Sequence, residues 1–107
     1  MSKIVIAGND PEKLGEELER QGGTVQYAEG TADRPALEDA GILEANVLVI
    51  TDVGLATSVT VALDMNPDLR TVFYTRDSVP EFVKGQVGHI IDPTLLGVET
   101  VAEELLR

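Results

Sequence analysis

Five short apolar segments alternate with helical patterns along the chain, and this alternation is the feature that most constrains the fold. It predicts parallel strands covered by helices on both faces. Residues 46–51 are apolar on both sides of the strand, which places them at the centre of the sheet. Right-handed crossovers then leave the strand orders 2-1-3-4-5 and 3-2-1-4-5, and a central third strand favours the first. The five segments are residues 3–7, 24–28, 46–51, 70–75 and 87–91.

We therefore predict a single domain over residues 1–107, folded as a three-layer α/β/α Rossmann-like sandwich with a five-stranded parallel sheet of flavodoxin-like order 2-1-3-4-5. Asp10 followed by Pro11 is typical of a helix start, with the carboxylate as cap and proline in the first turn. The last helix is expected to begin near Leu95. Leu96 and Leu106 lie off its apolar stripe and are candidates for a homodimer contact.

The charge of the chain limits its partners. Its 8 Lys and Arg against 19 Asp and Glu give a formal net charge of −11. A surface this acidic disfavours nucleic acid and anionic membranes. The acidic, lysine-poor composition resembles that of proteins from extreme halophiles, in which salt screens the repulsion between carboxylates. The chain has no cysteine, no signal peptide and no long apolar span, so we expect a cytoplasmic protein without membrane insertion.

Polar residues follow the predicted strands at the edge where α/β sheets bind ligands. Asp10 has two interpretations there, helix cap and ligand contact, and the cap is the simpler. Whether Asp10 and Asp52 together bind a divalent cation is left open by the sequence. No metal site and no catalytic residue are predicted. Arg76 is the candidate for holding an anion. The candidate cofactor-binding residues are Gly8, Asn9, Asp10, Glu29, Thr51, Asp52 and Arg76.

The second half of the chain resembles the TrkA-N domain, the nucleotide-binding Rossmann module, also called RCK or KTN, that regulates potassium transport. The resemblance rests on the order and spacing of residues 37–52, 65–70 and 88–93, which contain Ala-Gly-Ile before a strand ending in Thr-Asp, then Asn-Pro, then Gly-His-Ile-Ile-Asp-Pro. It implies a regulatory domain that is not an enzyme, with a potassium transporter or another regulatory protein as its partner.

The first half departs from the TrkA-N pattern. Of the family's G-x-G-x-x-G sequence only Gly8 is in place, because Asp10 stands at the second glycine. The comparison with the family pattern also implies that one strand–helix unit is missing from this chain. Glu29 is the counterpart of the ribose-binding acid, so the resemblance implies NAD or an adenine nucleotide bound weakly or not at all. A pyrophosphate facing Asp10 and Glu12 would lack the glycine N–H donors that it needs.

A second resemblance is to the receiver domains of response regulators. These have five strand–helix units, acids after the first strand, a phosphorylated Asp after the third, Thr after the fourth, and Lys before Pro after the fifth. Asp10, Asp52 and Thr75 fit this pattern, whereas Asp92 replaces the lysine and puts a negative charge where a phosphoryl group needs a positive one.

The sequence therefore favours a non-enzymatic regulatory or ligand-sensing domain related to TrkA-N, with a degraded dinucleotide site. A compact module that still binds NAD or an adenine nucleotide is the alternative. A receiver-like phosphorylation switch is the third reading.

Overall fold

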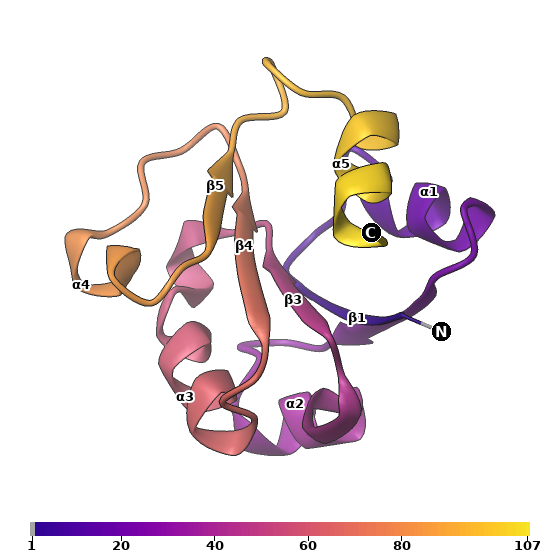
Figure 1. Ribbon diagram of the computed structural model, residues 1–107. Coiled ribbons are helices and arrows are strands. Elements are labelled where there is room, and N and C mark those ends of the chain that lie inside the picture. Colours follow the sequence, from indigo (N-terminus) through magenta and orange to yellow (C-terminus); the bar gives the residue numbers. More distant parts are fainter. Residues whose placement is uncertain (1) are drawn as a thin grey trace.

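Five parallel strands form one sheet in the order β2-β1-β3-β4-β5 in the computed structural model, which describes residues 2–107 (Figure 1). This confirms the predicted fold class and strand order. The strands are β1 (Lys3–Ala7), β2 (Thr24–Ala28), β3 (Val47–Ile50), β4 (Arg70–Tyr74) and β5 (His89–Ile91). The helices are α1 (Leu14–Arg20), α2 (Arg34–Asp39), α3 (Thr57–Met65), α4 (Glu81–Lys84) and α5 (Val98–Leu105), with the 3-10 turns η1 (Ile42–Glu44) and η2 (Val53–Leu55).

Strand β3 lies in the middle of the sheet because every one of its residues is apolar and buried. Ile50, its last residue, is paired with Ala7 of β1 on one side and with Phe73 of β4 on the other. The carboxyl ends of β1, β3 and β4 are therefore at the same level. This register brings together the loops that follow the three strands.

The helices cover the sheet in two layers. Leu14 and Leu18 of α1 pack with Val101 and Leu105 of α5 in one apolar cluster, which includes Ile4. Figure 1 shows α1 beside α5, the last helix of the chain, and the two helices are in contact. Burying a leucine of this kind contributes about 1.5–3 kcal/mol.

The second layer is made by α2, α3 and α4 on the opposite face of the sheet. Leu37 of α2, Val59 of α3 and Val83 of α4 are completely buried against Phe73 and its neighbours. No helix among residues 2–107 is both long enough and apolar enough to cross a membrane.

Two helices begin later than the sequence predicts. The first starts at Leu14, after Lys13 in a left-handed conformation (φ 59°), rather than near Pro11. The last starts at Val98, since the backbone N–H groups of Leu95 and Leu96 donate instead to the carbonyl of Asp92 in a turn.

The sequence predicts that Leu106 lies off the apolar stripe of the last helix, and this prediction is wrong. Leu106 packs against the α1–α5 cluster, where one of its methyl groups approaches Gly23. Leu96 is 42% exposed, so of the two leucines considered for a dimer contact only this one has a large accessible surface.

Candidate functional site

The loops after β1 and β3 touch at the carboxyl edge of the sheet. Gly8 has φ +107°, and a Cβ at this position would collide with Oγ1 of Thr51 and lie 3.1 Å from Cβ of Asp52. The Thr51 hydroxyl in turn donates to the carbonyl oxygens of Ala7 and Asn9. A glycine is therefore needed at position 8 for close packing of two loops as well as for backbone conformation.

Asp10 is engaged by three hydrogen-bond donors. Its Oδ1 accepts the backbone N–H of Leu14 (2.9 Å), and its Oδ2 accepts the backbone N–H of Gly15 (2.8 Å) and the hydroxyl of Tyr27 (3.0 Å). Asp10 thus caps α1 as expected, but from four residues before the helix instead of from its usual position. The carboxylate is a structural part of the β1–α1 loop.

Asp52 and Thr75 follow β3 and β4. Asp52 is exposed, and its Oδ1 accepts the backbone N–H of Gly54 (2.8 Å) at the start of η2. Thr75 is buried, and its hydroxyl oxygen accepts the backbone N–H of Asp77 (3.1 Å). Both side chains organise the turns that they belong to.

Arg76 joins three loops. Its Nη1 lies 2.8 Å from Oε2 of Glu12 in the β1–α1 loop, and its Nε donates to the Thr94 hydroxyl (3.1 Å) in the β5–α5 loop. The hydrogen bond and charge of Glu12 raise the pKa of Arg76 above its ordinary value. The positive charge that the sequence offers to an anion is already paired with a carboxylate.

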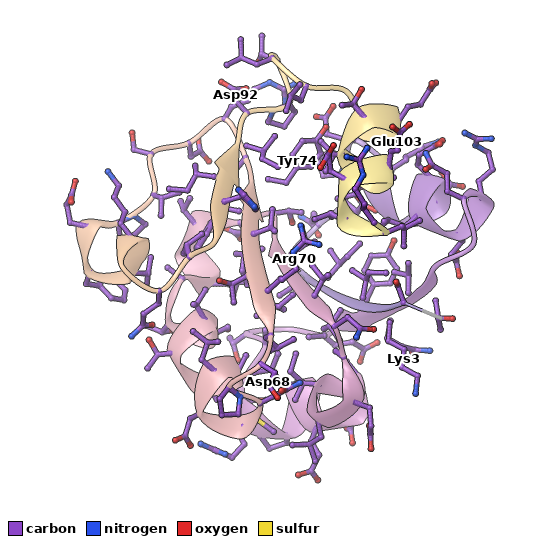
Figure 2. The ribbon with its side chains drawn as sticks, in the orientation of Figure 1. Lys3, Asp68, Arg70, Tyr74, Asp92 and Glu103 are labelled. Atoms are coloured by element: carbon purple, nitrogen blue, oxygen red, sulfur yellow. The ribbon has the colours of Figure 1, made fainter. Side chains whose placement is uncertain are left out.

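Asp92 forms a turn at the end of β5. Its Oδ1 accepts the backbone N–H of Thr94 (2.8 Å). Figure 2 shows Asp92 on the turn beyond β5, at the same end of the sheet as Tyr74, which points from β4 toward α5. The Tyr74 hydroxyl donates to the carbonyl of Leu96 (3.0 Å), which fixes this turn to the sheet.

The seven candidate residues divide between two hollows at this edge. Asp10, Thr51 and Arg76 line a cavity of about 260 Å³. Gly8, Asn9, Glu29 and Asp52 line a second, of about 430 Å³. The complete lining of the first is Asp10, Pro11, Glu12, Thr51, Tyr74, Thr75, Arg76, Asp77 and Pro93. In the first hollow the carboxylates outnumber the single arginine. The lining of the second contains carboxylates and no Lys or Arg. Neither hollow therefore attracts a pyrophosphate.

Two residues of this edge, Tyr27 and Thr94, are not found by sequence reasoning, and the pairing of Glu12 with Arg76 is not found either. Tyr27 reaches Asp10 from the neighbouring strand, while Glu12 and Thr94 hold Arg76 from loops at opposite ends of the chain. The one available signal was Tyr27 itself, an amphipathic side chain on a strand predicted to lie beside the β1–α1 loop.

The strand order and the two helix layers define a flavodoxin-like α/β fold, and response regulators are among the solved structures that share it. The domain is similar to an orphan response regulator of H. pylori, with 13% identity, coverage of 99% of this chain and 97% of the other, and a TM-score of 0.74. It is also similar to a structure of the histidine kinase ThkA with the response regulator TrrA (15% identity, 100% of both chains, TM-score 0.72). A third similar structure is a Burkholderia pseudomallei response regulator with a phosphorylated aspartic acid and a calcium ion (20% identity, 99% of this chain and 71% of that one, TM-score 0.65).

The chain belongs to a family of unknown function, DUF7126, whose model matches residues 4–105. No curated protein matches the sequence. These solved structures are described as response regulators, and at 13%, 15% and 20% identity they establish the fold alone.

The resemblance to TrkA-N is wrong, and with it the prediction of a potassium-transport regulator with a degraded dinucleotide site. The family match is to DUF7126, and the solved structures that share the fold include response regulators and pilus assembly proteins. The motifs that carried the resemblance are ordinary turn chemistry: Gly41 has φ +84° before η1, and Asn66 accepts the backbone N–H of Asp68. Five strands complete this fold, so no strand–helix unit is missing.

Proposed function

We propose that this chain is a receiver-like regulatory domain that acts by binding a partner protein and does not depend on aspartyl phosphorylation. The first part of the proposal is supported by similarity to response regulators over almost the full length of both chains. The second part is supported by the strand-end residues, among which Asp10 is the most informative.

One similar response regulator holds a phosphorylated aspartic acid and a calcium ion, and the receiver pattern has acids after the first strand and the phosphorylated aspartate after the third. In this chain the residues after β1 are Gly8, Asn9 and Asp10. Two backbone N–H groups and the Tyr27 hydroxyl point at the two oxygens of Asp10, where a cation would have to lie. Releasing Asp10 would cost about 1–2 kcal/mol of helix capping. The donor set does not fit a magnesium ion.

The electrostatics at Asp52 also oppose a phosphoryl group. Such a group adds about −1.5 to −2 charge. Asp92 stands before Pro93, where receivers have lysine, and Arg76 is committed to Glu12. A phosphoryl group on Asp52 would have to break that ion pair to gain a cationic partner.

Regulatory proteins are the proposed class of partner, and we place the interaction in the cytoplasm. One of the similar response regulators was crystallised with a histidine kinase, which supports protein recognition by this fold. The fixed loops at the carboxyl edge favour a domain that presents a constant surface to its partner.

The test is a titration of the isotopically labelled chain with beryllofluoride and Mg²⁺, which mimic aspartyl phosphorylation, followed by NMR. We expect no saturable shifts of the amides near Asp52 and Thr75. The matched comparison is the double variant Asn9→Asp, Asp92→Lys, which restores the second acid after β1 and the lysine after β5 that receivers have. Wild-type shifts that saturate only when Mg²⁺ is present would overturn the proposal, whatever the variant does.

A further inference from the structure

Strand β2 is an edge strand with unpaired backbone groups. The backbone N–H of Thr24 donates to the carbonyl of Ser2 (2.9 Å), so Thr24, Gln26 and Ala28 face β1. Alternate residues of a parallel strand face opposite neighbours, which turns the N–H and C=O groups of Val25 and Tyr27 away from the sheet. No strand of residues 2–107 pairs with this side.

A groove runs beside β2 because α2, only six residues long, leaves part of this face uncovered. It consists of two hollows that share Asp39 and Ala40. One, of about 350 Å³, lies beside Thr24 and Gln26. The other, of about 260 Å³, lies beside Tyr27 and Glu29. The groove thus follows the strand from its first residue to just beyond its last.

The groove is acidic. Glu29, Asp39 and Glu44 line it, and Lys3 is the single cation in its lining. The chain as a whole carries −11. A segment that docks here would gain from positive charge on its own side chains.

We propose that a partner protein adds an extended, lysine- or arginine-containing segment as a sixth strand beside β2. Backbone hydrogen bonds to Val25 and Tyr27 hold the segment, and its basic side chains on the α2 side enter the groove near Asp39. The inference rests on the proposed function, since it names the surface and the chemistry of the partner.

A second copy of this chain is a poor occupant of the same edge. Pairing β2 with β2 would bring two acidic grooves together, each on a domain with a net charge of −11. Like charges placed opposite one another across an interface oppose association. The acidic lining therefore selects a basic partner over self-association.

The experiment uses a peptide of alternating Thr and Lys, about ten residues long and so enough to span one strand. It is titrated into the labelled chain at about 0.15 M salt, where the Debye length is ~8 Å. We expect shifts of the amides of residues 24–28 and slower hydrogen exchange at Val25 and Tyr27. The same peptide N-methylated at alternate residues keeps its charge but cannot pair, and should not bind.

Two charge-reversal variants distinguish binding in the groove from nonspecific attraction of the basic peptide to the acidic chain. Asp39→Lys should weaken peptide binding about fivefold, while Glu103→Lys should change it less than about twofold. Asp39 lines both hollows, whereas Glu103 lies on α5, in the helix layer on the other face of the sheet (Figure 2).

Equal losses in the two variants, shifts away from β2, or no binding would overturn this inference. So would a chain that dimerises through β2 without peptide, seen as a doubled mass in sedimentation. None of these outcomes bears on the beryllofluoride titration, so the docking surface and the phosphorylation-independent function fail separately.

Discussion

At the scale of single residues, Asp10 and Tyr27 decide what the carboxyl edge of the sheet can do. The carboxylate holds the first two N–H groups of α1, and the tyrosine hydroxyl holds the carboxylate. Partial burial, followed by the hydrogen bond and the charge of Asp10, raises the pKa of Tyr27 to about 12. Because these hydrogen bonds occupy the Asp10 carboxylate, it is not available to bind a ligand.

The raised pKa of Tyr27 makes a prediction about alkaline stability. The unfolded chain releases the proton near the ordinary pKa of 10 and the folded chain at about 12. The contribution of Tyr27 to stability should therefore be complete below pH 10 and disappear as the pH rises through 12. Between pH 10 and pH 12, the free energy of unfolding should fall less with rising pH in Tyr27→Phe than in the wild type. Chemical denaturation at several pH values measures this difference.

The titration itself can be followed by tyrosinate absorbance in Tyr74→Phe, where Tyr27 is the remaining tyrosine. A midpoint near 10 would show that neither the partial burial of Tyr27 nor its hydrogen bond to Asp10 is present in solution.

At the scale of elements, α1 is positioned by the absence of a side chain. Gly15 lies in its first turn, and a Cβ there would collide with the Tyr27 hydroxyl and lie 3.2 Å from Oδ2 of Asp10. The glycine allows strand β2 and the β1–α1 loop to meet over the helix. Glycine stabilises a helix less than alanine does, but at this position only glycine leaves room for that contact.

Gly15→Ala is predicted to destabilise the domain by about 1–3 kcal/mol. In an open helix the same change is favourable by about 1 kcal/mol. Gly85→Ala is the matched control, because Gly85 has φ −72° and nothing lies within 4 Å of its added Cβ. Urea unfolding of both variants measures the difference. A Gly15→Ala protein as stable as the wild type would contradict the packing described for Tyr27.

The elements were largely predictable from sequence, and the site was not. Strand β3 is apolar throughout, so the local pattern was sufficient to predict it. Asp10 was identified as a cap for the same reason. Its bond to Tyr27, and that of Arg76 to Glu12, join residues 17 and 64 positions apart. Such pairs depend on strand order and loop geometry, which local patterns do not contain.

At the scale of the whole molecule, charge is spread over a small volume. The radius of gyration is 12.2 Å and the extents are 29 × 29 × 23 Å. At 0.1 M salt the Debye length is ~10 Å, so carboxylates on neighbouring elements still repel one another, whereas at 1 M it is ~3 Å. Most of this repulsion is therefore removed only by concentrated salt.

The unfolding midpoint is accordingly predicted to rise as KCl is increased from about 0.1 M to about 1 M, since salt screens repulsion within the folded state. The triple variant Glu38→Gln, Glu44→Gln, Asp68→Asn removes three exposed charges and should show a weaker dependence. Thermal unfolding of both proteins tests this. A midpoint independent of KCl would mean that the net charge of −11 costs the fold little.

The packing of α1 against α5 has a consequence for biosynthesis. Leu14 and Leu18 leave the ribosome about eighty residues before Val101 and Leu105, which cover them. Strand β1 likewise waits for β3 before it is paired on both sides. The nascent chain therefore leaves the cluster between α1 and the sheet incompletely covered until α5 has emerged, and folding is completed only then.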